Sequence, residues 1–274
     1  MTVSSHQHPD KKPAMSNTIL RIVTAVAFIP VIYAVFSGGM LATVICLVFG
    51  ALMAYEAIRI AGMTLITPIG IVYFIMIMLP AVMVIMPAAF QPAAPPSYLL
   101  GMGIVGLAFL AKDITTKLVM VSLCACVFSL LSIVLMDGGI DWLILAVVSV
   151  IAADSAAYFG GRRIGGPKLA PFISPSKTWS GALCGITAGG IAGYGVGMVI
   201  GFTPSLGALA GLVIADLSIG GDLLESWFKR RHGVKDSGSI LPGHGGFLDR
   251  FDGYLIVLPI LYVAIINGLS GYGG

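Results

Sequence analysis

Residues 221–253 read GDLLESWFKRRHGVKDSGSILPGHGGFLDRFDG, and the rest of the chain is organised around this stretch. It contains ten charged residues in thirty-three positions, five of each sign, together with two of the four histidines. Only 10% of the whole chain is charged, and apolar segments lie on both sides of the stretch. A membrane protein that gathers acids, bases and glycines in this way is expected to bind a highly charged ligand there.

The composition indicates a polytopic helical membrane protein. Hydrophobic residues make up 58% of the 274 positions, and a run of about 20 apolar residues can cross a bilayer as a helix. The four cysteines lie in such runs without a CxxC pair, so we interpret them as small hydrophobic residues. The sequence predicts an all-α fold with about nine transmembrane helices, at about 18–37, 40–61, 65–87, 97–111, 118–135, 142–159, 181–201, 204–228 and 253–270.

The basic residues predict the orientation, because Lys and Arg favour the cytoplasmic side of short loops. If the N-terminus is cytoplasmic and each run crosses once, all 15 Lys and Arg residues fall on the cytoplasmic side and the C-terminus lies outside. We therefore expect a multi-pass protein of the inner (plasma) membrane. The loops 160–180 and 229–252 should both be cytoplasmic.

Three regions are expected along the chain. Residues 1–17 are polar and are predicted to form a disordered cytoplasmic tail. Residues 18–150 should form the N-terminal transmembrane helices. Residues 151–274 should form a C-terminal transmembrane region that carries both charged loops and the candidate catalytic residues.

Two pairs of acidic residues lie within the charged stretch, one near each end. Asp222 and Glu225 stand three positions apart at the end of the eighth run, so they share a helix face. Asp249 and Asp252 repeat this spacing at the start of the ninth. Carboxylates suit hard cations such as Mg²⁺. The alternatives are that Asp249 and Asp252 favour a helix N-terminus and that Asp222 forms a buried pair with a Lys or Arg.

Asp154 and Asp216 lie deeper, within the sixth and eighth apolar runs. An ionisable group inside a membrane span is costly and is therefore a functional candidate. For Asp216 a metal-binding role and a structural ion pair remain equally open.

Four basic residues follow the eighth run: Lys229, Arg230, Arg231 and Lys235. They could bind phosphates, with the Arg side chains acting in bidentate fashion. The alternative is that they only fix the topology or attract anionic lipid, which we prefer for Arg231.

A second candidate phosphate site is ISPSKTWSG at positions 173–181. Ser174, Ser176, Lys177 and Thr178 supply hydroxyl groups and one cation just before an expected helix, where backbone amides also attract anions. Simple N-capping by Ser or Thr is the alternative. The GxxxxGKS pattern of a P-loop is absent from the sequence.

Glycines surround His244 in the segment PGHGG at positions 242–246. Glycine permits the close backbone approach that a ligand-binding loop needs. His244 could donate to a phosphate, accept a proton or only brace the loop, and the sequence does not separate these roles.

The spaced patterns SxxKRxxxxKD (226–236) and LPxHGGFxDRFD (241–252) together resemble the signature of the phosphatidate cytidylyltransferase (CDP-diacylglycerol synthase) family. The segments ADSAAYFGGRRIG (153–165), SPSKTW (174–179) and GDLLES (221–226) are also similar to motifs of that family. The resemblance covers about residues 150–253. It departs from the family pattern at Ser176, where a second Lys is common, and at Ser180, where an acid is common.

The resemblance implies that CTP and phosphatidic acid react to give CDP-diacylglycerol and diphosphate, with Mg²⁺ as cofactor and K⁺ as a candidate second ion. The partners would be CTP, phosphatidic acid and the lipid bilayer, with no nucleic acid, and a homodimer is left open. It implies catalytic roles for Asp222, Lys229, Asp249 and Arg250. It implies substrate contacts from Ser174, Ser176, Lys177, Thr178, Arg230, Lys235 and His244. The implied metal ligands are Asp222, Asp249 and Asp252, with Asp216 as a fourth candidate.

Two other functions remain as alternatives. A CTP-dependent lipid kinase would transfer the γ-phosphate of CTP and release CDP instead of diphosphate. A membrane transporter could use Asp154 and Asp216 as its pathway, but most of the acids cluster near one predicted membrane edge.

Overall fold

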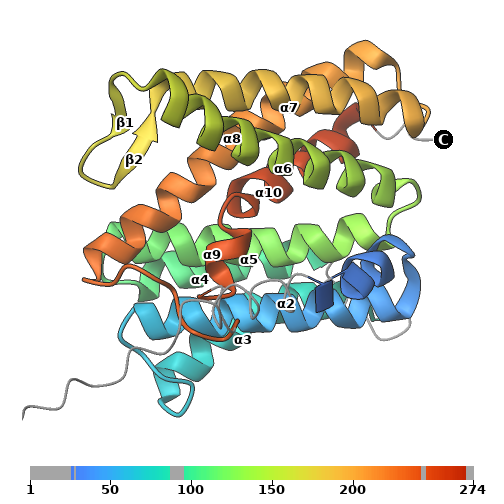
Figure 1. Cartoon of the computed structure of the whole chain (residues 1–274). Helices are drawn as coiled ribbons and strands as arrows, with labels where there is room; N and C mark the ends of the chain where they lie inside the picture. Colours follow the sequence, from blue (N-terminus) through green and yellow to red (C-terminus); the bar gives the residue numbers. More distant parts are fainter. Residues whose placement is uncertain (1–25, 28, 87–95, 242–244, 270–274) are drawn as a thin grey trace, which may run out of the picture.

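The computed structural model describes residues 26–27, 29–86, 96–241 and 245–269, and its helices form two layers with a short group between them (Figure 1). One layer contains α2 (Gly39–Ile60), α3 (Pro68–Val84), α4 (Pro96–Leu110) and α5 (Ile114–Leu135). The other contains α6 (Gly139–Ile164), α7 (Trp179–Val199) and α8 (Pro204–Arg231). Between them lie α9 (Leu248–Phe251), α10 (Tyr254–Ala264) and the π-helical turn η2 (Ile265–Leu269).

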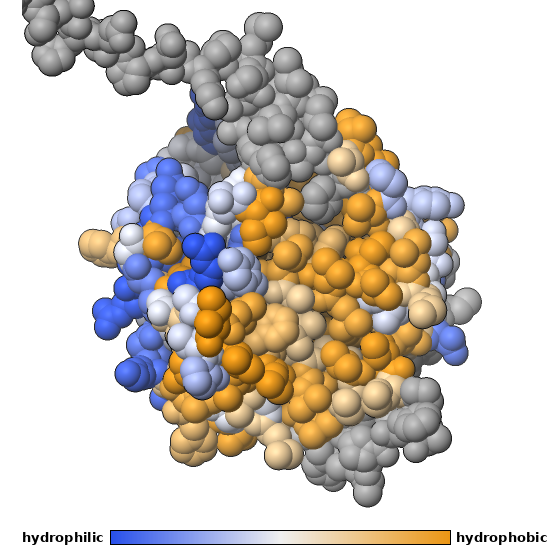
Figure 2. Space-filling view, turned by 90° about the horizontal axis from the view of Figure 1, so that it is seen from below, coloured by the Kyte–Doolittle hydropathy of each residue, from blue (hydrophilic) through white to orange (hydrophobic). Residues whose placement is uncertain are grey.

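The helices confirm a multi-pass α-helical membrane protein. Five of those described, α2, α5, α6, α7 and α8, are long and apolar enough to cross a bilayer, and α3, α4 and α10 belong to shorter apolar helices. Each apolar run expected from position 40 onward contains a helix, and positions 29–36 of the first run are helical. Figure 2 shows a broad hydrophobic surface with many of the hydrophilic residues along one edge. Exposed apolar side chains are expected where a surface faces lipid.

The loop expected at 160–180 is more structured than the sequence analysis predicted. Helix α6 continues to Ile164, and the strands β1 (Lys168–Ala170) and β2 (Ser174–Thr178) then form an antiparallel hairpin. Thr178 pairs with Lys168, and the amide of Trp179 donates to the carbonyl of Pro167 at 3.1 Å. In the described part of the chain this hairpin is the one sheet among the helices, and it leads directly into α7.

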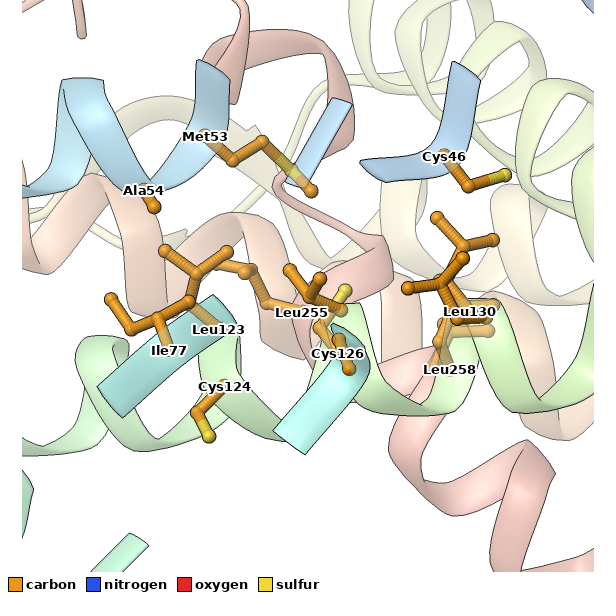
Figure 3. Close-up of a cluster of buried hydrophobic side chains, with 14 of the residues drawn as sticks. Cys46, Met53, Ala54, Ile77, Leu123, Cys124, Cys126, Leu130, Leu255 and Leu258 are labelled. Carbon is orange, nitrogen blue, oxygen red and sulfur yellow. The ribbon is translucent and has the colours of Figure 1, made fainter. Parts of the chain in front are cut away.

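A hydrophobic core joins the first layer to α10 (Figure 3). Met53 of α2, Ile77 of α3, Leu123 of α5 and Leu255 of α10 are all buried within it. Cys46, Cys124 and Cys126 are free and buried in the same cluster, which confirms their interpretation as small hydrophobic residues.

Helices α7 and α8 approach so closely that only glycine fits between them. A Cβ atom added at Gly193 would lie 2.3 Å from the carbonyl oxygen of Gly207 and 2.8 Å from the Cα atom of Gly211. A Cβ atom at Gly189 would lie 2.9 Å from the carbonyl oxygen of Gly211. Small residues spaced by four positions allow such close packing of membrane helices. This contact fixes α8 relative to α7.

The C-terminal end of α8 is held against the start of α5, toward which α8 slants in Figure 1. Asp113 caps α5 by accepting a hydrogen bond from the Thr116 amide at 2.9 Å, and the Thr116 hydroxyl lies 3.3 Å from Nε2 of His232. Burial alone would raise the pKa of Asp113, but hydrogen bonds from Thr115 and Thr116 hold it well below its ordinary value. These contacts hold the C-terminal end of α8 in place, and the loop that follows α8 starts there.

The glycine contact between α7 and α8 yields a prediction. Gly193→Val should lower the thermal unfolding temperature of the detergent-solubilised protein, because the side chain would force the two backbones apart. The matched control is Gly195→Val on the same helix, where an added Cβ meets nothing within 4 Å. Equal unfolding temperatures for the two variants would contradict the close contact.

Candidate active site

A cavity of about 570 Å³ opens between α6, the β-hairpin, α7 and α8. Binding pockets for small molecules commonly have volumes of about 300–1,000 Å³. Its polar lining includes side chains of both signs, which suits a ligand that carries phosphates together with a cation. The charged residues that line it are Asp154, Arg162, Lys168, Lys177 and Asp222.

Strand β2 and the start of α7 shape one wall of the cavity. Thr178 is the N-cap of α7, and its hydroxyl oxygen accepts a hydrogen bond from the Gly181 amide at 3.1 Å. A Cβ atom at Gly181 would lie 2.8 Å from the carbonyl oxygen of Ala157, so α7 lies close to α6 there. The structure thus shows the capping role for Thr178 while also placing this residue in the cavity lining.

An ion pair between Lys177 and Asp222 joins the two segments that the sequence analysis singled out. Asp222 also accepts a hydrogen bond from the Ser226 hydroxyl, one turn further along α8, at 3.2 Å. Both members of the pair line the cavity and are about one quarter to one third exposed. Because each side chain is accessible, each can exchange its partner for a charged ligand.

The junction of α9 and α10 brings Asp252 toward the same carboxylate. A Cβ atom at Gly221 would lie 2.6 Å from the carbonyl oxygens of both Asp252 and Gly253, so only glycine allows this approach. Burial and then the negative charge of Asp222 raise the pKa of Asp252 well above its ordinary value, and Asp154 adds to this effect. The three carboxylates therefore repel one another, and a bound cation would relieve the repulsion.

A second group of charges, around Lys229, is buried. Its ammonium lies 2.6 Å from Oδ1 of Asp249 and 2.5 Å from Oε2 of Glu225. Asp249 also accepts hydrogen bonds from the amides of Ser237 and Gly246, each at 3.0 Å. Burial opposes ionisation, but the bonds from Lys229 and the amides lower the pKa of Asp249. This group is internally paired, and the cavity lining does not include its members.

The predicted site residues are therefore distributed between several places. Ser176, Lys177, Thr178 and Asp222 line the cavity, whereas Lys229 and Asp249 belong to the buried group. Asp222 and Asp249 thus have separate partners. Within the described part of the chain, no group of three or more His, Cys, Asp or Glu side chains is arranged to hold a metal ion.

The other predicted residues lie around these two groups. Arg230 points to the hairpin, and its Nε donates to the carbonyl oxygen of Ile173 at 3.5 Å. Ser174 is partly buried on β2, and His244 lies outside the described residues. Three more are exposed: Asp216, Lys235 and Arg250.

Three residues with a place in this region were not among the predicted site residues. Arg162 and Lys168 line the cavity, but their charges were used only to predict orientation. Glu56 of α2 is 1% exposed and contacts the charged stretch. An isolated Glu inside an apolar run was an available signal for it.

A sequence model described as the cytidylyltransferase family matches residues 19–266 of the chain. The chain belongs to the cytidylyltransferase family. It is similar to a phosphatidate cytidylyltransferase of Brucella suis biovar 1 (strain 1330), with 45% identity over 141 residues, which cover 50% of this chain and 52% of the relative.

Two further relatives carry the same description. One is from Rickettsia bellii (strain RML369-C), 41% identical over 142 residues, which cover 47% of this chain and 59% of that relative. The other is from Staphylococcus aureus (strain COL), 41% identical over 131 residues, which cover 47% and 50%. The chain thus matches these curated relatives over about half of their length.

The buried charge group yields a prediction about stability. Lys229→Met should lower the free energy of unfolding by about 3–5 kcal/mol, because Glu225 and Asp249 would lose their common cation. The measurement is chemical or thermal unfolding in detergent. Lys235→Met, at an exposed position, is the control.

The double variant Lys229→Met with Glu225→Gln should recover part of that loss, since one of the uncompensated buried charges is then removed. If Lys229→Met and Lys235→Met had the same stability, the proposed pairing would be wrong.

Proposed function

We propose that this family member is a phosphatidate cytidylyltransferase, which converts CTP and phosphatidic acid into CDP-diacylglycerol and diphosphate. The observation that carries the proposal is the cavity at the hairpin, where Lys177 and Asp222 form an exchangeable ion pair beside further charges of both signs. The names of the similar proteins support the same activity.

In this reaction the protein mainly has to neutralise the charge of two anionic substrates, and it forms no covalent bond with them. An oxygen of the phosphatidate phosphate attacks the α-phosphorus of CTP, and the bond from that phosphorus to the bridging oxygen of the β-phosphate breaks. Diphosphate leaves with the bonding electrons. No general base is needed, because a phosphate monoester dianion is already nucleophilic. The protein must position the two anions and balance their charge.

Side chains of the cavity fit these demands. Lys177 can turn from Asp222 to a phosphate, and Arg162 and Lys168 add two more cations on the same lining. Phosphate contacts by Lys229, Arg230 and Arg250 stay predictions. The hairpin and the ends of α6, α7 and α8 that line the cavity lie at one side of an apolar bundle. The lipid phosphate can therefore enter the cavity while the acyl chains remain in the bilayer.

The carboxylates fit a divalent cation. Mg²⁺ binds to one or two protein carboxylates and completes its shell with water and substrate phosphates. Asp222 and Asp252 would hold it, with Asp249 as a further candidate and K⁺ as a candidate second ion. When bound, Mg²⁺ would neutralise charge on the reacting phosphates.

The membrane arrangement is part of the proposal. We place nine crossings in the inner (plasma) membrane, with the N-terminus cytoplasmic and the C-terminus outside. The contacts of Lys177 with Asp222 and of Arg230 with Ile173 support this, because they bring two cation-rich segments to one end of the α7–α8 pair.

The activity is tested with the purified protein, phosphatidic acid, Mg²⁺ and CTP labelled at either the α- or the γ-phosphate. We expect the α-label in a liponucleotide and the γ-label in diphosphate, and EDTA should stop both. Transfer of the γ-label to lipid would show a lipid kinase instead, and the absence of turnover would contradict the proposal.

Asp222→Asn should lower kcat by at least about 100-fold, because the cavity would lose a charge that holds the cation. Asp137→Asn is the control, since Asp137 is exposed just before α6, far along the helix from the cavity. Both variants should be checked for unchanged unfolding temperature. Full activity of Asp222→Asn would remove this residue from the site.

Adjacent arginines offer a matched test of the cavity lining. Arg162→Gln should raise the KM for one phosphate-bearing substrate by about tenfold, because one charge-assisted hydrogen bond is lost. Arg163→Gln should change it little, since Arg163 does not line the cavity. Equal effects of the two substitutions would mean that Arg162 acts only through the general charge of this surface.

A further inference from the structure

Glu56 links the first layer of helices to the charged stretch near the C-terminus. It lies on α2 and is 1% exposed. Its Oε2 atom accepts hydrogen bonds from the Ser237 hydroxyl at 2.9 Å and from the Leu248 amide at 2.7 Å. Both partners belong to the segment that carries the candidate catalytic residues, so this carboxylate joins two distant parts of the chain.

The partners of Glu56 are also the immediate supports of Asp249. The Ser237 amide donates to Oδ2 of Asp249 at 3.0 Å, and the Asp249 amide donates back to the Ser237 hydroxyl oxygen at 3.3 Å. Asp249 in turn lies 2.6 Å from Nζ of Lys229. A continuous series of contacts therefore runs from Glu56 through Ser237 and Asp249 to α8.

The backbone around Glu56 leaves room for little except its carboxylate. A Cβ atom at Gly238 would lie 2.4 Å from Oε1 of Glu56, and one at Gly246 would lie 1.8 Å from the Ser237 hydroxyl oxygen. Two turns earlier on α2, the ring of Phe49 packs against that of Phe247 at a centroid distance of 4.9 Å. One face of α2 thus contacts both ends of this segment.

Burying a carboxylate among apolar helices is costly unless hydrogen bonds compensate for it. If Glu56 only stabilised the helical bundle, donors on the neighbouring helices would be enough to provide those hydrogen bonds. The partners of Glu56 instead lie in the loop after α8 and at the start of α9. We propose that Glu56 is a positioning residue, which fixes the segment around Ser237 and Leu248 and thereby sets the positions of Asp249 and Asp252 relative to α8. This inference rests on the proposed function for its catalytic consequence.

The test compares Glu56→Ala with Glu56→Gln in the cytidylyltransferase assay. The alanine variant should lose at least tenfold in kcat while its KM for CTP changes less than threefold. The glutamine variant should keep at least a third of kcat, because one amide oxygen can still accept both hydrogen bonds. Unchanged kcat in the alanine variant would overturn the proposal. Equal loss in both variants would also overturn it, since the charge itself would then be required.

A double variant separates positioning from general destabilisation. Ser237→Ala combined with Glu56→Ala should be no slower than the slower single variant, because both residues act through one series of contacts. If the loss in kcat of the double variant equalled the product of the losses of the two single variants, the two residues would act independently, which would contradict the proposed series of contacts. Thr43→Val is the control for packing, since Thr43 is buried on the same helix and donates to the carbonyl of Gly39.

A second readout does not depend on activity. Trypsin should cleave Glu56→Ala after Lys235 at least five times faster than wild type, whereas Thr43→Val should match wild type. If the wild-type enzyme made no liponucleotide, the proposed function would fail while this measurement still tested the role of Glu56. Equal cleavage rates for Glu56→Ala and wild type would overturn the positioning role.

Discussion

A charged side chain inside an apolar helical bundle needs an opposite charge or hydrogen-bond partners, and this constraint determines how the polar parts of the molecule are arranged. Lys177 with Asp222 forms one pairing, and Lys229 with Glu225 and Asp249 forms another. The first faces a cavity, so a ligand can replace either partner. The second is closed and holds the charged stretch in place. The accessible pair of Lys177 and Asp222 is thus separate from the buried group around Lys229.

Close backbone contacts make this separation possible. Glycines let α7 lie against α8, and Gly221 lets the junction of α9 and α10 approach α8 beside Asp222. The hairpin of β1 and β2 then places Lys177 over the same turn of α8. A Cβ atom would not fit at these backbone contacts. The positions of the charged side chains therefore depend on the glycines between the helices.

Much of the helical fold could be predicted from the sequence, because long apolar runs have few alternatives in a membrane protein. The sequence also singled out Lys177, Thr178 and Asp222 as candidate site residues, and all three line one cavity. The hairpin was missed, since SPSKT is too short to show a clear strand pattern. The pairing of Lys229 with Asp249 was not predicted, because it depends on tertiary contacts that sequence spacing does not encode. Glu56 could have been singled out as an acid inside an apolar run, but its partners could not, because they lie 181 and 192 positions later.

The central claim is that the carboxylates beside the cavity hold a divalent cation when the nucleotide is bound. Anomalous diffraction from crystals grown with Mn²⁺ and a non-hydrolysable CTP analogue tests this most directly. We predict a manganese peak within about 2.0–2.4 Å of a carboxylate oxygen of Asp222, with Lys177 turned toward a phosphate. A peak located elsewhere, with Asp222 still paired to Lys177, would contradict it.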